Sequence, residues 1–461
     1  MTLTCRRRKH FACLLTTVRG STCTVTNHSF KIPCGFEWHL KASLKQIAGG
    51  QHYGTSWPGE VGTGASKKPL KVLLISDYGS PSGGAELQML ALKEHLISRG
   101  HDVRFLSSDV MLHGVATLAD RTCKGYSDRR QVLTQTLNLS AFRALRRELR
   151  EHPPDVVHIR MFLWQLSPLI LTALRDVPVL FQAAVYKAVC PNGLKILPDA
   201  TQCTSRAGYV CYQTGCVSAG TWISAMAQLA MLRRWRQNID AVATLSQAMA
   251  RIFEENGFKD VLVLPNGIDE APYCPSLSSS PLVAYAGRLS REKGLDVLFD
   301  AFDGVRKRLP GARLLVVGTG PLEDVLRRRA RGAGSQVQIE GQLEYADLQE
   351  RLQEAWVQVV PSVWQEPFGN VSLEAMIRGT AVVASDVGGQ SELVDDGRTG
   401  YLVRPGDVEM LTEKLLRLVT DRAHAEALGQ AGRQKAQAFF TRRAAVDRIE
   451  QTYEKILASA R

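Results

Sequence analysis

The first strand of a parallel sheet is predicted at Lys71-Val-Leu-Leu-Ile-Ser-Asp77, which runs into the glycine-rich turn Gly79-Ser-Pro-Ser-Gly-Gly84. A continuous aliphatic run bounded by turn residues is typical of a strand buried on both faces of a sheet. A helical pattern follows over 85–99, and another strand-forming run lies over 102–107. This strand–helix–strand order predicts an α/β protein that begins with an open parallel sheet.

The same alternation continues along the chain in two series. Further strands of the first series are predicted over 155–160, 177–183, 241–246 and 261–264. Those of the second series are predicted over 282–288, 313–318, 336–341, 357–362, 381–386 and 401–404. Two doubly wound sheets of this kind hold ligands at the carboxyl ends of their strands, so a cleft between two Rossmann-like domains is expected.

These patterns divide the chain into five parts. Residues 1–69 are expected to be an unstructured or spurious extension, and residues 70–270 a Rossmann-like domain with a cysteine-containing insertion at 184–220. A Pro- and Ser-rich linker is placed at 271–281, before a second Rossmann-like domain over 282–440. The last part, 441–461, is predicted to be a helix that returns to the first domain.

The charge of the chain is concentrated at its amino terminus. The formal net charge is +12, yet residues 1–69 alone hold ten Lys or Arg and only two acidic residues. The remainder is close to neutral, which argues against a nucleic-acid-binding protein. Arg6 to Lys9 followed by an apolar run over 11–18 imitates a signal peptide, and an Arg-rich start also imitates a transit peptide. An upstream translation start is the third interpretation.

Ten cysteines in a chain of this length do not indicate a disulfide scaffold, and a cytoplasmic protein with reduced thiols is expected. Four of the cysteines cluster in the sequence, at Cys190, Cys203, Cys211 and Cys216. Four thiolates could close a tetrahedral zinc site, although no Cys-x2-Cys pair is present. A disulfide and ordinary buried thiols are the alternatives. No other metal site is predicted.

The stretch Val360-Pro-Ser-Val-Trp-Gln-Glu-Pro-Phe-Gly-Asn-Val-Ser-Leu-Glu-Ala375 carries the clearest chemical signal. Pro367 holds Glu366 in a loop behind a strand, and a helix is predicted to start near Asn370 with Glu374 one turn inside it. The unpaired N–H groups at a helix start form a phosphate site. Ionised carboxylates beside that site are suited to binding sugar hydroxyls, because carboxylates only accept hydrogen bonds.

Arg288 and Lys293 follow a predicted strand end and Gly287, so both are expected to project into the cleft. Two fixed cations can stabilise the charge that develops on a diphosphate leaving group. The chain contains no Asp-x-Asp metal motif, so protein groups would supply this stabilisation. Gly79 to Gly84 does not fit Gly-x-Gly-x-x-Gly, which disfavours a dinucleotide dehydrogenase.

Together these motifs resemble the family-4 retaining glycosyltransferases of the GT-B fold, also called glycosyl transferases group 1. The family signature is a pair of glutamates separated by seven residues, here Glu366-Pro-Phe-Gly to Glu374. Other matches occur in the expected order: Ser82-Gly-Gly-Ala-Glu86, Pro265-Asn-Gly-Ile-Asp269, Gly287-Arg-Leu-Ser-Arg-Glu-Lys-Gly294, Val317-Gly-Thr-Gly-Pro321 and Val387-Gly-Gly389 with Glu392. The resemblance covers roughly residues 70–440.

The resemblance implies a retaining, metal-independent transferase that uses a nucleoside-diphosphate sugar and no other cofactor. Arg288, Lys293 and Glu366 would be catalytic, with Glu366 binding the transferred sugar and Glu374 the ribose. The donor-binding residues would be Gly83, Gly84, Gly287, Gly318, Phe368, Gly369, Asn370 and Glu374. The acceptor would be a glycan or a lipid-linked glycan, as in polysaccharide or glycolipid biosynthesis.

The chain departs from the family pattern on the acceptor side. Ala184 and Val185 stand where family members often carry a His-Asp pair, and Arg160 stands where a second histidine is common. The departures leave two alternatives open, a non-catalytic nucleotide-sugar-binding protein and a sugar-nucleotide epimerase of the same architecture.

No run approaches the roughly 18 apolar residues of a membrane-spanning helix. Two segments, 229–236 and 142–150, mix apolar and basic residues at helical spacing. They indicate either core helices with a solvated basic face or a peripheral contact with anionic lipid at the inner face of the cell membrane.

Overall fold

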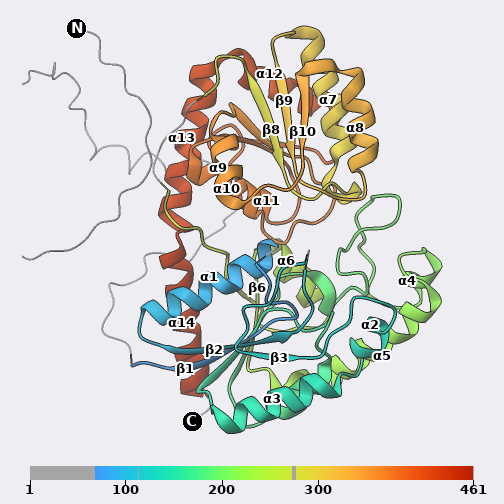
Figure 1. Cartoon of the computed structure of the whole chain (residues 1–461), viewed down its shortest axis with the longest axis vertical. Coiled ribbons are helices and arrows are strands. Elements are labelled where there is room, and N and C mark those ends of the chain that lie inside the picture. The colour runs from blue at the N-terminus through green and yellow to red at the C-terminus, as the bar shows by residue number, and fades with distance from the viewer. Residues whose placement is uncertain (1–67, 82, 113, 272–276, 460–461) are drawn as a thin grey trace, which may run out of the picture. The chain divides into compact units, whose positions relative to one another are not determined.

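The computed structural model describes residues 68–271 and 277–459, apart from Ser82 and His113. Nearly all of the predicted extension over 1–69, the middle of the predicted linker, and the cysteines Cys5, Cys13, Cys23, Cys34 and Cys274 lie outside these residues. The described residues contain two parallel sheets (Figure 1).

The first sheet has seven strands in the order β3-β2-β1-β4-β5-β6-β7, all parallel. Its strands are β1 (Lys71–Ile75), β2 (Asp102–Ser108), β3 (Arg121–Cys123), β4 (Val156–Ile159), β5 (Val179–Gln182), β6 (Ala241–Thr244) and β7 (Leu262–Val263). The accompanying helices are α1 (Gly84–Ser98), α2 (Gln131–Thr134), α3 (Leu139–Glu151), α4 (Val210–Gln213), α5 (Ala219–Trp235) and α6 (Gln247–Glu255). The strand β3 was not predicted, because its three residues carry no aliphatic run.

The second sheet has six parallel strands in the order β10-β9-β8-β11-β12-β13. They are β8 (Leu282–Ala286), β9 (Arg313–Val317), β10 (Val337–Glu340), β11 (Val357–Val360), β12 (Ala381–Ser385) and β13 (Tyr401–Val403). The helices are α7 (Leu295–Arg308), α8 (Glu323–Gly332), α9 (Tyr345–Gln353), α10 (Asn370–Arg378), α11 (Gln390–Leu393), α12 (Val408–Thr420), α13 (Arg422–Phe439) and α14 (Arg442–Ser459). The predicted α/β class with two doubly wound sheets is confirmed.

Short 3-10 turns complete the chain path, at η1 (Pro168–Ala173), η2 (Tyr186–Ala188), η3 (Arg236–Asn238), η4 (Arg291–Lys293) and η5 (Gly334–Gln336). Most predicted strands extend one or two residues past the observed ones, because the last residues of each run already turn toward the loops. The central strands have almost no exposed surface, which explains why they read as continuous aliphatic runs rather than as an alternation.

The last two helices pack on different halves of the chain. α13 packs against α10 and β12 of the second sheet, whereas α14 contacts α1 and β5 of the first. In α14, the hydroxyl of Tyr453 lies 2.7 Å from Nδ1 of His158 on β4, and both side chains are buried. Burial, together with the nearby charge of Arg160, lowers the pKa of His158 to about 3. His158 is therefore a neutral core residue.

Candidate functional site

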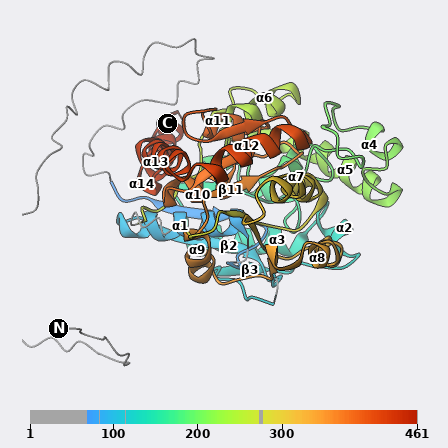
Figure 2. The same ribbon diagram turned by 90° about the horizontal axis from the view of Figure 1, so that it is seen from above.

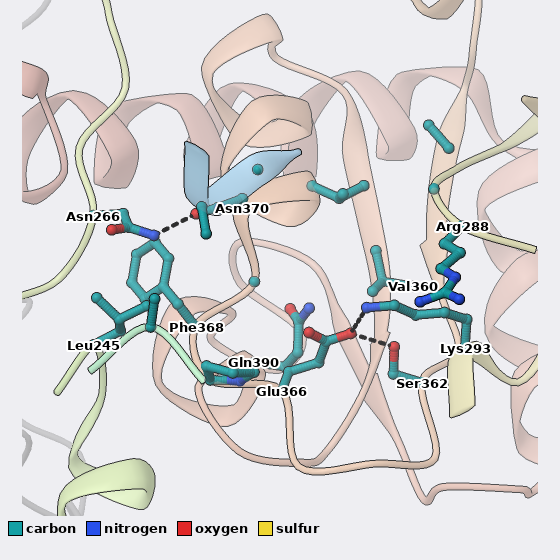
Figure 3. Close-up of a pocket in the computed structure, with 18 of the residues that line it drawn as sticks. Leu245, Asn266, Arg288, Lys293, Val360, Ser362, Glu366, Phe368, Asn370 and Gln390 are labelled. Carbon is teal, nitrogen blue, oxygen red and sulfur yellow. Dashed lines mark hydrogen bonds and ion pairs between the residues drawn. The ribbon is translucent and has the colours of Figure 1, made fainter. Parts of the chain in front are cut away.

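A pocket of about 300 Å³ is lined by residues from both sheets (Figure 3). The first half contributes Gly84 at the start of α1, Arg160 after β4, Ala184, Leu245 and Asn266. The second half contributes Gly287, Arg288, Lys293, Ser362, Glu366, Phe368, Gly369, Asn370 and Gln390, among others. Arg160, Leu245 and Gly287 directly follow a strand, and the other residues lie in the loops and helix starts after strand ends, which is where parallel sheets place ligands.

Lys293 and Glu366 form an ion pair in the pocket wall, with Nζ of Lys293 2.7 Å from Oε1 of Glu366 (Figure 3). The hydroxyl of Ser362 donates to the same carboxylate oxygen at 2.6 Å. Burial alone would raise the pKa of Glu366, but the charge of Lys293 and the hydrogen bonds outweigh it and lower the pKa. Glu366 is therefore ionised at neutral pH and can only accept hydrogen bonds.

Gly294 brings Lys293 to this position. Its backbone has φ +67, and an added Cβ would lie 1.9 Å from the carbonyl oxygen of Pro361. Only glycine fits this close approach, which lets the turn at η4 pass directly over the loop that follows β11. The backbone N–H of Val363 donates to the carbonyl of Glu292 at 3.0 Å and holds the two loops together.

Arg288 directly follows β8 and Gly287, and its side chain is exposed at the pocket. The hydroxyl of Tyr285 donates to the carbonyl oxygen of Arg288 at 2.9 Å and orients the backbone there. Within the described part of the chain, no ion pair holds the guanidinium of Arg288. A cation with this freedom can bind an anionic ligand without first breaking an internal bond.

The helix α10 begins at the pocket. Its N-cap residue, Gly369, has φ +119 and offers no side chain to accept a hydrogen bond from the helix. The N–H of Leu373 makes the first hydrogen bond of the helix, to the carbonyl of Gly369. The earlier N–H groups have no acceptor within the helix, as at every helix start. A helix start of this kind is suited to anions, and Gly369 and Asn370 line the same pocket as Arg288 and Lys293.

Three of the predicted donor-binding residues do not line the pocket. Gly318 supports Gly287 from behind, since a Cβ on Gly318 would lie 2.0 Å from the carbonyl oxygen of Gly287. Gly83 precedes α1, where a Cβ would meet the carboxylate of Glu86 at 2.2 Å. Glu374 is half-buried on α10, and burial raises its pKa to about 7 although the charge of Arg378 opposes this.

The acceptor side contains a hydrogen-bonded chain that the sequence did not predict. The guanidinium of Arg160 donates to Gln182 at 3.0 Å and to Oδ1 of Asn266 at 2.5 Å. Asn266 in turn donates to Oδ1 of Asn370 at 2.8 Å, which links the first half to the start of α10 (Figure 3). Ala184 lines the pocket without any polar side-chain group.

Gln390 is a further pocket residue that sequence reasoning missed. Its side chain is fully buried and accepts a hydrogen bond from the hydroxyl of Ser372 at 2.7 Å. The neighbouring N–H of Gly389 donates to the carbonyl of Glu366 at 2.8 Å. The Val387-Gly-Gly389 turn was the available signal, because such a turn after a strand allows a close backbone approach.

The four clustered cysteines lie in the segment between β5 and α5. Cys190 and Cys211 are buried, Cys203 and Cys216 are half-buried, and all four are free thiols. Burial raises the pKa of Cys211, and the charges of the other three cysteines, which lie nearby, raise it further. No set of three or more His, Cys, Asp or Glu within the described ranges has the geometry of a metal site.

Two family models match this chain. Residues 82–271 match the model of Glycosyltransferase Family 4, and residues 275–435 match that of Glycosyl transferases group 1. The alpha-maltose-1-phosphate synthase of Mycobacterium tuberculosis is 33% identical over 275 residues, which cover 53% of this chain and 68% of that enzyme. The phosphatidyl-myo-inositol mannosyltransferase of Mycobacterium leprae is 33% identical over 209 residues, 44% of this chain and 56% of that protein.

Solved structures show the same fold. Sucrose-phosphate synthase from Thermosynechococcus elongatus has a TM-score of 0.64 and 25% identity, over 84% of this chain and 99% of that one. HepE of Anabaena, in complex with UDP and glucose, has a TM-score of 0.61 and 18% identity over the same shares. The two family models together span every pocket residue named above and all strands of the two sheets except β1. The chain therefore belongs to glycosyltransferase family 4, the glycosyl transferases group 1, and has the GT-B fold.

Proposed function

We propose that this protein is a retaining, metal-independent glycosyltransferase that moves a sugar from a nucleoside-diphosphate sugar to a glycan or lipid-linked glycan. The observation that supports this most is the meeting of Arg288, Lys293, Glu366 and the start of α10 in one pocket. Two cations and unpaired helix N–H groups are suited to a diphosphate, and an ionised carboxylate beside them is suited to sugar hydroxyls.

In this proposal the diphosphate lies against Arg288, Lys293 and the amides of Phe368, Gly369 and Asn370. As the bond to the sugar breaks, negative charge grows on the leaving diphosphate, and these fixed groups stabilise it without rearranging. Lys293 has a second task, because its ion pair keeps Glu366 ionised and in place. Glu366 then accepts hydrogen bonds from the transferred sugar.

Glu374 is proposed to accept hydrogen bonds from the ribose of the donor. It lies one turn into α10, so a nucleotide whose diphosphate meets the helix start extends toward it. Gly83 and Gly84 are proposed to approach the donor from the first half, where a Cβ on Gly84 would come within 3.2 Å of the Asn370 amide. Gly287 and Gly318 are proposed to leave room for the nucleotide beside β8 and β9.

The relatives support a nucleotide-sugar donor and a carbohydrate or lipid acceptor. Their names describe a mannosyltransferase that acts on phosphatidyl-myo-inositol and a synthase of maltose 1-phosphate. HepE was solved with UDP-glucose as well as with UDP and glucose. The alignments with the mannosyltransferases cover less than two thirds of those proteins, so the acceptor of this chain is part of the proposal.

The test is turnover of purified variants with a panel of nucleoside-diphosphate sugars, with release of nucleoside diphosphate as the readout. Arg288→Ala and Lys293→Ala are each expected to lower kcat roughly 100-fold, because one aimed donor contributes about 3 kcal/mol to the transition state. Arg291→Ala is the matched control, since Arg291 is exposed on η4 and does not line the pocket. Unchanged turnover in both pocket variants would contradict the mechanism.

The same assay with a chelator tests metal independence. Transfer is expected to continue, because Arg288, Lys293 and α10 supply the charge stabilisation. Activity that is lost to the chelator and restored by magnesium or manganese would refute this part of the proposal. Restoration by zinc alone would assign a structural metal to the cysteines of the insertion.

A second function is favoured by Ala184, which leaves the pocket without the histidine common in the family. A non-catalytic nucleotide-sugar-binding protein would bind one member of the panel tightly and release no nucleoside diphosphate with any acceptor. A sugar-nucleotide epimerase would instead convert one donor into its epimer, which separation of the nucleotide sugars would detect.

A further inference from the structure

The two segments that the sequence singled out for lipid contact turn their apolar side chains inward. On α5, Leu229 and Leu232 are buried, and on α3 Leu145 is buried while Ala144 and Leu149 pack partly buried against the same core. Within the described ranges, no helix is both long enough and apolar enough to cross a membrane. Any membrane contact by this part of the chain must therefore use other side chains at the surface.

The structure exposes a different set of apolar residues on the first half of the chain. Leu133 and Leu137 at α2 are 72% and 52% exposed, and Ile223 on α5 is 63% exposed. Tyr209 and Tyr212 at α4 are 57% and 42% exposed. We name these five residues, with the half-buried Trp222, the apolar patch.

The elements that carry the apolar patch are neighbours: α5 contacts both α2 and α4, and α4 and α5 lie together at the right of Figure 2. Thr136, beside Leu137, meets the hydroxyl of Ser224 at 2.6 Å, and Ser224 follows Ile223 directly. Trp222, on the other side of Ile223, packs against both tyrosines, with ring centroids 5.7 Å and 6.2 Å away. Isolated exposed apolar residues are ordinary, whereas a joined set with three aromatic rings marks an interaction surface.

Basic residues are frequent in the two segments that carry the apolar patch. Residues 124–150, which contain α2 and α3, hold seven Lys or Arg and two acidic residues. One of the two acids, Glu148, is buried between Arg104 and Arg121. Residues 200–239, which contain α4 and α5, hold four Arg and no acidic residue. The rest of the chain beyond residue 69 has more acidic than basic residues, so the positive charge of this part of the chain is concentrated in these two segments.

We propose that the apolar patch docks on the surface of an anionic membrane. Tyr and Trp favour the boundary between headgroups and acyl chains, where their rings are half in apolar surroundings. Leu133, Leu137 and Ile223 enter the acyl region, while Arg129, Arg130 and Arg206 meet the lipid phosphates. A protein partner would be expected to present acidic residues here, but a lipid surface satisfies both the apolar and the cationic side chains at once.

This inference goes beyond the proposed function, because vesicle binding requires no donor, acceptor or turnover. Docking would hold the first half of the chain, and with it Arg160 and Ala184 at the pocket, close to a lipid-linked acceptor. A protein that binds vesicles but transfers no sugar would support this inference and contradict the proposed function. A protein that transfers sugar but does not bind vesicles would contradict this inference alone.

The experiment is co-sedimentation of the full-length protein with vesicles of phosphatidylcholine alone or mixed with phosphatidylglycerol. The wild type is expected to bind the mixed vesicles, with weaker binding as salt rises because the Arg contacts are screened. The double variant Leu133→Ser, Ile223→Ser is expected to bind at least about tenfold more weakly, since two apolar side chains no longer enter the lipid. The basic amino-terminal segment is identical in both proteins, so the difference reports on the patch.

Ile97→Ser on α1 and Val325→Ser on α8 form the matched control, because these residues are also 49% and 47% exposed but lie outside the patch. All variants should retain the wild-type melting temperature and affinity for nucleoside diphosphate. Equal vesicle binding by the patch and control variants would overturn the proposal, as would no binding by the wild type. Concentration-dependent dimers that the patch variants abolish, without vesicle binding, would assign the surface to a second copy of this chain instead.

Discussion

Glu366 and Glu374 are the same residue type in one motif, yet their surroundings differ. Glu366 meets the ammonium of Lys293 and the hydroxyl of Ser362, so its pKa is lowered despite burial. Burial raises the pKa of Glu374 to about 7, and the charge of Arg378 opposes this only in part. Glu366 is therefore charged at neutral pH, whereas Glu374 gains or loses a proton near neutral pH.

Glu374→Gln is expected to stabilise the ligand-free protein at alkaline pH. The carboxyl has an ordinary pKa of 4.5 and a folded pKa of about 7, so the folded state holds its proton more tightly. Stability therefore falls as pH rises between these values, and the ionised side chain costs on the order of 2 kcal/mol above them. Urea unfolding at about pH 5 and about pH 8 should show a gain for the variant only at the higher value.

Glu350→Gln, on the exposed surface of α9, is the matched control and should show no such pH dependence. The same Glu374 variant should bind the nucleoside-diphosphate sugar more weakly, because a neutral amide accepts ribose hydrogen bonds less strongly than a carboxylate. A variant less stable than the wild type at both pH values would contradict the raised pKa. Unchanged donor affinity would contradict the ribose assignment.

At the scale of the element, α10 depends on the residue that precedes it. Gly369 has φ +119, and an added Cβ would lie 2.8 Å from Nε2 of Gln390. The strain and this contact would turn the first N–H groups of the helix away from the pocket. We therefore expect α10 to bind the proposed diphosphate only with glycine at its N-cap.

Gly369→Ala is expected to lower the free energy of unfolding by about 1–3 kcal/mol and to weaken nucleoside diphosphate binding roughly tenfold. Denaturant unfolding and calorimetric titration measure the two effects. Gly311→Ala is the control, because that glycine has open space around its Cα. If Gly369→Ala lost stability but kept full affinity, the amides of α10 would not be the diphosphate site.

At the scale of the whole molecule, a few contacts join the two halves. The carboxylate of Glu392 on α11 accepts the N–H groups of Gln247 and Ala248 at 2.9 Å and 2.7 Å, and so caps α6 from the other half. The side-chain amide of Asn266 in the first half donates a hydrogen bond to Oδ1 of Asn370 in the second half. A buried apolar cluster with Met161 and Phe368 also contains residues of both halves. These contacts set the width of the pocket.

Glu392→Ala is expected to loosen this junction. Two partly buried N–H groups lose their acceptor and α6 loses a negative charge at its start, which together cost about 1–3 kcal/mol. Small-angle scattering of the ligand-free variant should show a larger radius of gyration, and donor affinity should fall. Glu409→Ala is the control, since this exposed acid lies in the first turn of its own helix, α12. An unchanged radius and unchanged unfolding would show that Glu392 does not hold the halves together.

The sequence by itself determined the class of the fold, the positions of nearly all strands along the chain and the motif around Glu366. These features are local: an aliphatic run such as Lys71–Ile75 is buried on both faces, and Pro367 and Gly369 bend the chain wherever they occur. Arg288 and Lys293 were also found this way, since a residue after a strand and a glycine lies at the sheet edge. The short β3 was missed because three residues carry too little pattern.

Only the tertiary structure decided which of these residues meet. Lys293 and Glu366 are 73 positions apart, and their contact depends on how two loops cross at Gly294. The sequence also did not show that Asn266 lines the pocket and that Glu374 does not. The direction of a side chain follows from the packing of whole elements. The same holds for the apolar patch: Leu133 and Leu145 look alike in sequence, but one is 72% exposed and the other fully buried. Exposure depends on what the rest of the chain covers.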